Sequence, residues 1–318
     1  MRYFITGGAG FVGSNMADRL LNEGHEVVVY DNGSTGLERF LSSAKENKRF
    51  QLIWGDILNE SALKKAMEGC DFVFHFAANA DIRDNLFHPN FVFEHNAKGT
   101  LNVLEAMRAT GVRSIAFSST GSVYGEPEVF PTPEDAPFPI QTSLYAASKS
   151  YGEGLISAYC EGYGFTGYIF RFVSLLGERY PHGHVFDFVK RLKKNPEMLQ
   201  ILGDGHQRKS YLYIGDCLNA ILTAIHATNH GVSIYNLGTD EYCEVKDSAG
   251  WIAERMGLQP EFTFTGGKRG WVGDSPFIYL DTKKIWSLGW KPELTIRQAV
   301  ERTVDYLMEN PWLLEARK

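Results

Sequence analysis

The stretch Thr6-Gly7-Gly8-Ala9-Gly10-Phe11-Val12-Gly13 decides the fold of this 318-residue chain. The apolar run Tyr3-Phe4-Ile5 stands before it, and Met16 and Leu20 continue a helical pattern after it. A glycine-rich turn between a strand and a helix lets the main chain approach a pyrophosphate closely, and the free N–H groups at the helix start can then bind the phosphates. The segment predicts a dinucleotide site, with contacts expected from Gly7, Gly10, Phe11, Val12 and Gly13.

Short apolar runs alternate with amphipathic helical patterns through the first half of the chain. The runs occupy residues 3–5, 27–30, 52–54, 72–76, 115–117 and 168–170. Continuous apolar strands between helices are typical of a parallel sheet that helices cover on both faces. The sequence therefore predicts an α/β fold. We expect a Rossmann-type, doubly wound parallel sheet over residues 1–172 and a smaller C-terminal α/β substrate-binding portion over residues 173–318, with a soft, interleaved boundary.

Bulk properties narrow the class of protein. A formal charge of −6 argues against the basic stripe that a nucleic-acid-binding surface needs. No apolar stretch is long enough to span a membrane, and the first residues have the pattern of a strand, so no signal peptide is expected. The cysteines are far apart and are expected to be reduced thiols of a cytoplasmic protein; they are Cys70, Cys160, Cys217 and Cys243.

An acidic residue, Asp31, ends the second predicted strand. It stands at the distance from the glycine-rich turn at which a carboxylate accepts hydrogen bonds from the adenosine ribose hydroxyls. The same charge would repel a 2′-phosphate, and the following Asn32-Gly33-Ser34 contains no Arg. These features predict NAD rather than NADP as the cofactor, with Asn32 and Ser34 as further contacts.

A catalytic pair is indicated by Tyr145 and Lys149, which a helix would place on one face. A neighbouring ammonium and the positive nicotinamide ring would favour the phenolate and lower the pKa of Tyr145 from about 10 toward neutrality. Three hydroxyls follow the apolar run 115–117, at a strand end where open α/β sheets bind ligands. We predict that Thr120 shares the substrate hydroxyl proton with Tyr145, that Ser118 lies near the cofactor, and that Ser119 bonds only local backbone.

Eight segments resemble the extended short-chain dehydrogenase/reductase family, in particular its nucleotide-sugar epimerase/dehydratase branch. They are TGGAGFVGS at 6–14, DNGS at 31–34, GDI at 55–57, HFAA at 75–78, NAKGTLNVLEA at 96–106, SSTGSVYG at 118–125, YAASK at 145–149 and GDG at 203–205. The resemblance implies adenine contacts from Asp56 and Ile57. It also implies that Asn96 and Phe172 lie near the cofactor, which would be lined by Phe76, Ala77 and Ala78.

The two residues after Thr120 separate branches of this family. By resemblance, 4,6-dehydratases carry Asp-Glu there, and UDP-glucuronate decarboxylases usually carry a Glu in the same stretch. This chain has Gly121 and Ser122, which cannot supply that chemistry. The leading prediction is a 4-epimerase of the UDP-glucose/UDP-galactose type, with a transient 4-keto sugar and retained NAD. A nucleotide-sugar 4-dehydrogenase or ketoreductase with net redox stays open, as does a non-catalytic NAD-binding sensor.

The second half of the chain holds the residues that the resemblance assigns to a nucleotide-diphosphate sugar. Lys209 and Tyr211 follow the GDG segment, and Ser174 stands where the family often has an Asn. A variant of an R-x-G-D element, with extra residues inside it, contributes Arg269 and Asp274. His184 is expected to line the substrate; it and His182 lack a third ligand, so no metal is predicted.

An assembly is also implied by the resemblance. In this family two long helices from each subunit commonly form a four-helix interface. The candidate helices here are residues 91–109 and 144–163, the second of which interleaves Leu155, Ile156 and Tyr159. A homodimer is therefore predicted.

Overall fold

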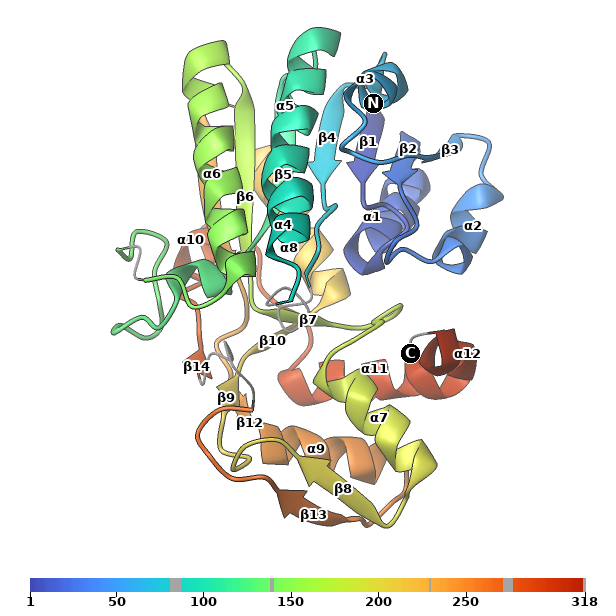
Figure 1. Cartoon of the computed structure of the whole chain (residues 1–318), viewed down its shortest axis with the longest axis vertical. Coiled ribbons are helices and arrows are strands. Elements are labelled where there is room, and N and C mark those ends of the chain that lie inside the picture. Colours follow the sequence, from blue (N-terminus) through green and yellow to red (C-terminus); the bar gives the residue numbers. More distant parts are fainter. Residues whose placement is uncertain (81–86, 138–139, 229, 271–276, 317–318) are drawn as a thin grey trace. The chain divides into compact units, whose positions relative to one another are not determined.

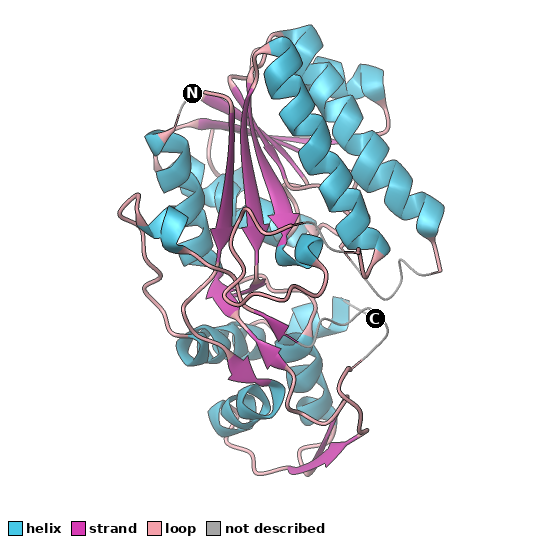
Figure 2. Cartoon of the chain, turned by 90° about the vertical axis from the view of Figure 1, so that its left-hand side faces the viewer, coloured by secondary structure: helices cyan, strands magenta, loops and turns pink. Residues whose placement is uncertain are grey.

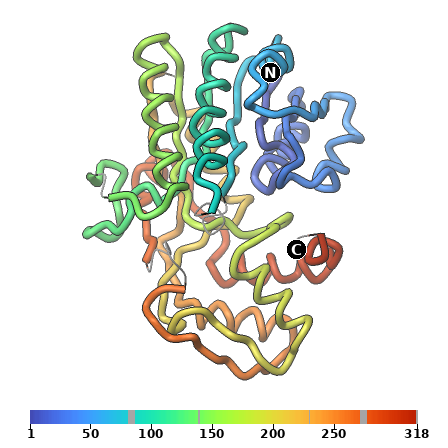
Figure 3. Tube along the Cα trace, in the orientation of Figure 1, coloured from blue at the N-terminus to red at the C-terminus, as the bar shows by residue number. Residues whose placement is uncertain are grey.

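The computed structural model describes residues 1–80, 87–137, 140–228, 230–270 and 277–316, so the predicted substrate residue Asp274 lies outside the described residues. The chain divides into two compact units. Unit 1 comprises Met1–Gly125, Ile140–Arg171 and Ile221–Tyr235, and unit 2 comprises Glu126–Pro139, Phe172–Ala220 and Asn236–Lys318. Each unit is made of three segments of the chain, and Figure 3 shows the course of the main chain through them.

One sheet of seven strands dominates unit 1, in the order β3-β2-β1-β4-β5-β6-β11 (Figure 1). Strand β1 pairs in parallel with β2 and β4, β2 with β3, and β4 with β5. The strands are β1 Arg2–Thr6, β2 Glu26–Asp31, β3 Phe50–Trp54, β4 Phe72–His75, β5 Ser114–Thr120, β6 Thr166–Phe172 and β11 Val232–Leu237. The predicted doubly wound Rossmann-type sheet is confirmed, and the strand order reverses at β1, the point at which such sheets bind ligands.

Helices cover both faces of this sheet (Figure 2). Because β1-to-β2 and β3-to-β4 crossovers run in opposite directions and are right-handed, α1 and α3 belong to opposite faces. Helices α3, α5 and α6 pack against one another in sequence. The helices are α1 Phe11–Asn22, η1 Glu38–Leu41, α2 Ser42–Lys45, α3 Glu60–Met67, α4 Pro89–Val92, η3 Phe93–Lys98, α5 Gly99–Thr110, η4 Gly121–Tyr124, α6 Leu144–Tyr163 and α8 Ile214–Ala227, the last of which contributes to both units.

Unit 2 contains three small sheets, β10-β7, β12-β9-β14 and β13-β8, together with three mutually packed helices, α7, α9 and α11. Its elements are β7 Ser174–Leu176, α7 His184–Lys194, β8 Met198–Ile201, β9 Arg208–Lys209, β10 Tyr211–Tyr213, β12 Cys243–Glu244, α9 Val245–Arg255, β13 Glu261–Phe264, β14 Phe277–Ile278, α10 Lys283–Trp286, α11 Ile296–Glu309 and α12 Pro311–Ala316. Within the described residues, no helix is long and apolar enough to cross a membrane. All four cysteines are buried and unpaired.

Two local expectations need correction. The helix expected over 91–109 contains a π-helical segment, η3, in which hydrogen bonds follow a wider turn. On α6, Ile156 is fully buried and Tyr159 is 9% exposed, and both belong to the hydrophobic core of unit 1. These two side chains therefore face the sheet and α5 rather than a partner subunit.

Candidate functional site

The glycine-rich turn has the close approaches that a dinucleotide site requires. Gly7 adopts a positive φ of 68°, and a Cβ there would lie 2.6 Å from the Ala77 backbone nitrogen. A Cβ on Gly13 would lie 2.4 Å from the Gly7 carbonyl oxygen. Gly10 precedes α1 without a side-chain cap, and Phe11 and Val12 form the first turn. The N–H groups of that turn therefore face outward with the positive end of the helix dipole, as phosphates require.

Asp31 is tied to this turn. Its carboxylate accepts hydrogen bonds from the backbone nitrogens of Ala9 at 2.9 Å and Gly33 at 2.8 Å. Burial raises the pKa of the Asp31 carboxyl, and the two backbone bonds oppose that shift. Ser34 donates its backbone N–H to Asn32 at 3.0 Å, so the predicted contacts Asn32 and Ser34 lie in one turn after β2.

Asp56 lies close to the same turn. It accepts a 3.0 Å hydrogen bond from the Asn32 amide and a 2.8 Å bond from the Leu58 backbone. Burial acts to raise the pKa of Asp56, but these hydrogen bonds and the neighbouring His95 together outweigh burial and leave the pKa lowered. Ile57, the other predicted adenine contact, is 6% exposed and packs its side chain in the core.

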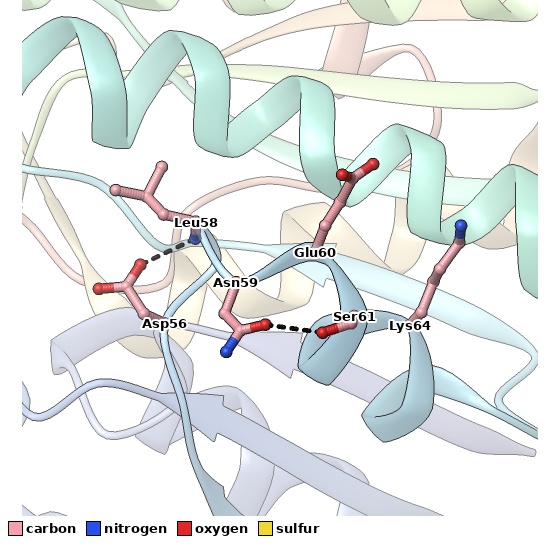
Figure 4. Close-up of a pocket in the computed structure, with 6 residues that line it drawn as sticks. All are labelled: Asp56, Leu58, Asn59, Glu60, Ser61 and Lys64. Carbon is pink, nitrogen blue, oxygen red and sulfur yellow. Dashed lines mark hydrogen bonds between the residues drawn. The ribbon is translucent and has the colours of Figure 1, made fainter.

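A shallow hollow opens beside Asp56 (Figure 4), lined by Asp56, Leu58, Asn59, Glu60, Ser61 and Lys64. Asn59 caps α3 by accepting the Ala62 N–H at 3.1 Å. Glu60 and Lys64 project from the following helical turns. Of the predicted cofactor residues only Asp56 lines this hollow, which contains none of the predicted catalytic side chains. The predicted catalytic residues lie instead at the strand ends and on α6.

A chain of hydrogen bonds links the segment after β4 to the predicted catalytic helix. The Phe76 and Ala77 nitrogens donate to Thr6, which ends β1. Two residues beyond Ala77, and next to Ala78, Asn79 donates to the Asn96 side chain at 2.7 Å, and that amide donates to Ser148 at 3.0 Å. The predicted cofactor-lining segment 76–78 and Asn96 are thus connected to α6.

The predicted Tyr145–Lys149 pair lies on α6, which packs against β5. Ser143 caps this helix by accepting the Ala146 N–H at 3.1 Å. Lys149 is 1% exposed, and its Nζ donates to the Ser118 carbonyl oxygen at 2.7 Å. The same Nζ lies 5.9 Å from the centroid of the Tyr145 ring. The structure therefore brings Ser118, Lys149 and Tyr145 together.

The hydroxyls at the end of β5 do not share one environment. Thr120 caps η4, because its Oγ1 accepts the Ser122 N–H at 3.1 Å. This bond orients the Thr120 hydroxyl and leaves its proton available to another acceptor. Ser118 donates its hydroxyl to the His75 carbonyl oxygen at 3.3 Å. Phe172, the predicted nicotinamide neighbour, is the last residue of β6.

The expected electrostatics of Tyr145 need correction. Burial raises the pKa of the Tyr145 phenol, and burial lowers the pKa of Lys149 to about 7, an effect that the charge of Glu153 opposes. The prediction that Lys149 lowers the pKa of Tyr145 is therefore wrong for the protein's own groups, since loss of water around the phenol raises that pKa instead. The positive charge of a nicotinamide ring bound beside the phenol would act in the predicted direction.

Glu153 lies one helical turn beyond Lys149, and it binds Arg171, which in turn binds Tyr124. Sequence reasoning missed all three residues. Ser119, expected to bond local backbone, instead donates its hydroxyl to the Glu153 carboxylate, because β5 turns this side chain toward α6. One signal existed in the sequence: Tyr145, Lys149 and Glu153 follow one another at intervals of four residues on one helix face.

In unit 2 the structure brings four of the predicted substrate residues together. Ser174 on β7 is the register partner of Tyr211 on β10. The His184 ring stacks on Tyr211 with centroids 4.7 Å apart, and its Nε2 lies 2.7 Å from the Ser248 hydroxyl. Burial, with a smaller effect of the Lys209 charge, lowers the pKa of His184 to about 3. Ser248 was missed by sequence reasoning.

Arg269 has a different environment. Its guanidinium forms an ion pair with Glu126, and both side chains are exposed. A diphosphate contact by Arg269 therefore competes with this carboxylate.

Comparisons with known proteins agree with this arrangement. The model of the NAD dependent epimerase/dehydratase family matches residues 3–238. A putative UDP-glucose 4-epimerase of Methanocaldococcus jannaschii is 33% identical over 313 residues, covering 96% of this chain and 98% of the relative.

Solved structures agree as well. A crystal structure of a UDP-galactose 4-epimerase has a TM-score of 0.88 and 36% identity, covering 98% of this chain and all of that one. The UDP-glucose 4-epimerase of Thermus thermophilus, solved in complex with NAD, has a TM-score of 0.85 and 33% identity, covering 97% and 99% of the two chains. Because the family model covers well over half the sequence, and the glycine-rich turn and the α6 pair stand where a dinucleotide enzyme needs them, this chain is an NAD-using enzyme that belongs to the NAD dependent epimerase/dehydratase family.

Proposed function

We propose that this enzyme is a nucleotide-sugar 4-epimerase of the UDP-glucose/UDP-galactose type that retains its NAD through turnover. The proposal depends on the composition of one site. The Tyr145–Lys149 pair of α6 packs on the end of β5, and the two residues after that strand are Gly121 and Ser122 rather than an acid and a base. Such a site provides for moving a hydroxyl proton and lacks the groups that elimination of water would need. The UDP-hexose epimerases among its relatives support the same class of substrate.

Tyr145 is the proton acceptor in this proposal. Bound NAD would take a hydride from C4 of the sugar and return it. Tyr145 accepts the proton of the C4 hydroxyl, and Thr120, oriented by its bond from Ser122, hydrogen-bonds the same oxygen. Lys149 would hold the nicotinamide ribose, and the positive nicotinamide ring would favour the phenolate of Tyr145. When the 4-keto sugar presents its other face, the Tyr145 hydroxyl donates the proton back, and the configuration at C4 is inverted.

Unit 2 is proposed to bind the nucleotide diphosphate, and unit 1 the cofactor. The cluster of Ser174, Lys209, Tyr211 and His184 supports this division, because it combines a cation with hydroxyl and ring groups on adjoining elements. Lys209 serves as a point charge for the diphosphate. Arg269 can bind the diphosphate only after its ion pair with Glu126 is broken.

Product analysis tests the activity. Purified protein that carries its own NAD is incubated with UDP-glucose and no added NAD, and the products are followed by NMR. UDP-galactose is the expected product, with the bound NAD content unchanged afterwards. Accumulating NADH without an epimer would instead establish net oxidation, and no product from a panel of UDP-, GDP-, CDP- and dTDP-sugars would reject catalysis on this class of substrate.

The matched variant is Tyr145→Phe, which removes one hydroxyl from the site. It is expected to lower kcat by about 100-fold or more, because general acid–base groups contribute at least that much. The variant should still bind NAD, measured as cofactor released on denaturation. Turnover at the wild-type rate would exclude Tyr145 as the acid–base group.

We also propose a cytoplasmic homodimer. Unpaired, buried cysteines are typical of a reducing compartment. Helix α6 exposes Leu144 and Tyr151, and Phe91 and Phe93 are exposed on the neighbouring segment, which supplies apolar side chains for a four-helix interface. Light scattering should give twice the chain mass, and Tyr151→Glu should lower it to one chain. A wild-type mass of one chain would reject the dimer.

A further inference from the structure

A buried ion pair lies one helical turn beyond the catalytic lysine. Glu153 on α6 is 4% exposed and Arg171 on β6 is 1% exposed. The pair is bidentate: Arg171 Nε lies 3.0 Å and Nη2 lies 2.7 Å from the two Glu153 oxygens. Arg171 Nη1 also donates to the Tyr124 hydroxyl at 2.7 Å. The network therefore joins α6, β6 and η4 in the interior of unit 1.

The same carboxylate also binds the end of β5. Ser119 donates its hydroxyl to Glu153, and Lys149 Nζ donates to the carbonyl oxygen of the preceding residue, Ser118, at 2.7 Å. Two successive residues of β5 are thus tied to two successive turns of α6. Thr120 follows directly, so its position relative to α6 is fixed by both bonds.

Among the described residues, the titratable groups next to Lys149 are Tyr145 and Glu153 on α6 and the buried His75 at the end of β4. Burial and the Lys149 charge lower the pKa of His75 to about 3. The Phe117 ring of β5 lies 4.6 Å from Nζ. Burial lowers the pKa of Lys149, and the negative charge of Glu153 acts against burial.

We propose that Glu153 is a positioning residue for the proposed reaction: held by Arg171, it fixes Thr120 through Ser119 and maintains the ammonium of Lys149 through its charge. This inference rests on the proposed catalytic roles of Tyr145, Lys149 and Thr120. A purely structural ion pair predicts a different result. Such a buried pair can often be replaced by apolar side chains without loss of stability, and loss of the Ser119 hydroxyl would then leave kcat unchanged.

The first test separates positioning from stability. Ser119→Ala removes only the hydroxyl that joins β5 to Glu153. It is expected to lower kcat about 10- to 100-fold with little change in KM, since a small misplacement of a reacting group has effects of this size. Ser119→Thr keeps the hydroxyl and should restore most of kcat. The matched control is Ser157→Ala, whose hydroxyl donates to the Glu153 backbone carbonyl at 2.8 Å, and which should leave kcat unchanged.

The second test needs neither substrate nor turnover. The NAD-loaded enzyme is labelled with carbon-13 at the lysine Cε atoms, and the Lys149 signal is identified by its absence in Lys149→Met. Glu153→Gln should lower the Lys149 pKa by about one unit, because an opposite charge close to an ammonium raises its pKa by at least that much. Ser119→Ala leaves the charge in place and should not move it.

A fallback variant covers the case in which Glu153→Gln does not fold. Replacing the pair together, Glu153→Met with Arg171→Met, leaves no unpaired buried charge, and it too should lower the Lys149 pKa. An unchanged Lys149 pKa in the folded variants, or full activity in Ser119→Ala, would overturn the inference. Since the titration involves no sugar, absence of epimerase activity in the wild-type enzyme would refute the proposed function without deciding this result.

Discussion

The Asp31 carboxylate has a structural role in the glycine-rich turn and a predicted role in binding the cofactor ribose. Its oxygens already accept the backbone N–H groups of Ala9 and Gly33, so the side chain holds the glycine-rich turn against the end of β2. Each carboxylate oxygen has a further lone pair that can accept a ribose hydroxyl. The charge itself, rather than these bonds, is what would repel a 2′-phosphate.

Asp31→Asn should therefore narrow the preference for NAD over NADP. The amide keeps one acceptor oxygen but removes the negative charge, so the affinity for NAD should fall and that for NADP should rise relative to it. Calorimetric titration with both dinucleotides measures the ratio of the two Kd values. Asp71→Asn is the control, because Asp71 also accepts a backbone N–H, from Arg2 at 2.7 Å, at the start of β1 rather than at its end. An unchanged ratio in Asp31→Asn would remove Asp31 from cofactor selection.

Residues whose role follows from a local pattern could be predicted from the sequence. The glycine-rich turn and the Tyr145–Lys149 spacing each lie within eight residues of chain. The Glu153–Arg171–Tyr124 network could not be predicted in this way, because it joins α6, β6 and η4. Pairing of a carboxylate with a guanidinium so far apart in sequence depends on how the strands order themselves in the sheet.

At the scale of elements, the site depends on how closely α6 approaches β5. Gly152 faces the sheet, and a Cβ there would lie 2.8 Å from Cζ of Phe117, the residue that precedes Ser118. Gly154 lies on the same helix with nothing within 4 Å of an added Cβ. Gly152 therefore allows the close approach of α6 to β5, whereas a side chain at Gly154 would meet no neighbouring atoms.

Gly152→Ala should lower the free energy of unfolding by about 1–3 kcal/mol, because overpacking a close contact has costs of that order. It should also lower kcat, since α6 carries Tyr145 and Lys149 and would move away from β5. Gly154→Ala should leave kcat unchanged and raise stability by up to about 1 kcal/mol through helix propensity. Urea unfolding and steady-state rates check both variants, and equal behaviour of the two would contradict this account of the helix–strand spacing.

The apolar periodicity predicted helices and strands correctly where one face of the element is buried and the other is exposed. Helices α7, α8, α9 and α11 have apolar residues at helical spacing in their sequences, so their existence follows from the sequence pattern. The π-helical segment η3 was not predictable, because its residues would suit an ordinary helix equally well. The sequence also did not show which apolar side chains of α6 face outward. Ile156 and Tyr159 were expected at a subunit interface, but they pack in the core of unit 1.

At the scale of the whole molecule, His75 in unit 1 and His184 in unit 2 both have a lowered pKa. His75 in unit 1 is completely buried between Thr6, 2.7 Å from its Nδ1, and Thr100, 3.0 Å from its Nε2. Burial lowers its pKa from 6.5 to about 3, and His184 in unit 2 is shifted in the same direction. The apolar run 72–76 places His75 in a predicted strand, but its two threonine partners belong to β1 and α5, which only the fold brings to it.

These shifts make stability depend on pH. Below its ordinary pKa of 6.5 the unfolded chain protonates His75, whereas the folded protein does not until about pH 3. The unfolded state therefore binds more protons in that window, so the stabilisation is complete above pH 6.5 and is lost as the pH falls toward 3. The slope for one such group is about 1.4 kcal/mol per pH unit, and His184, which is partly exposed, should contribute less.

Urea unfolding at a series of pH values from mildly alkaline to mildly acidic measures this slope. His75→Asn keeps a hydrogen-bonding side chain but cannot take up the proton, so its stability should fall less steeply with acid than that of the wild type. The two slopes should coincide above neutrality, where neither state protonates the histidine. Equal slopes for His75→Asn and the wild type in acid would contradict this prediction. They would mean that His75 is protonated in the folded protein as readily as in the unfolded chain. The buried site between two threonines would have to rearrange for that to happen.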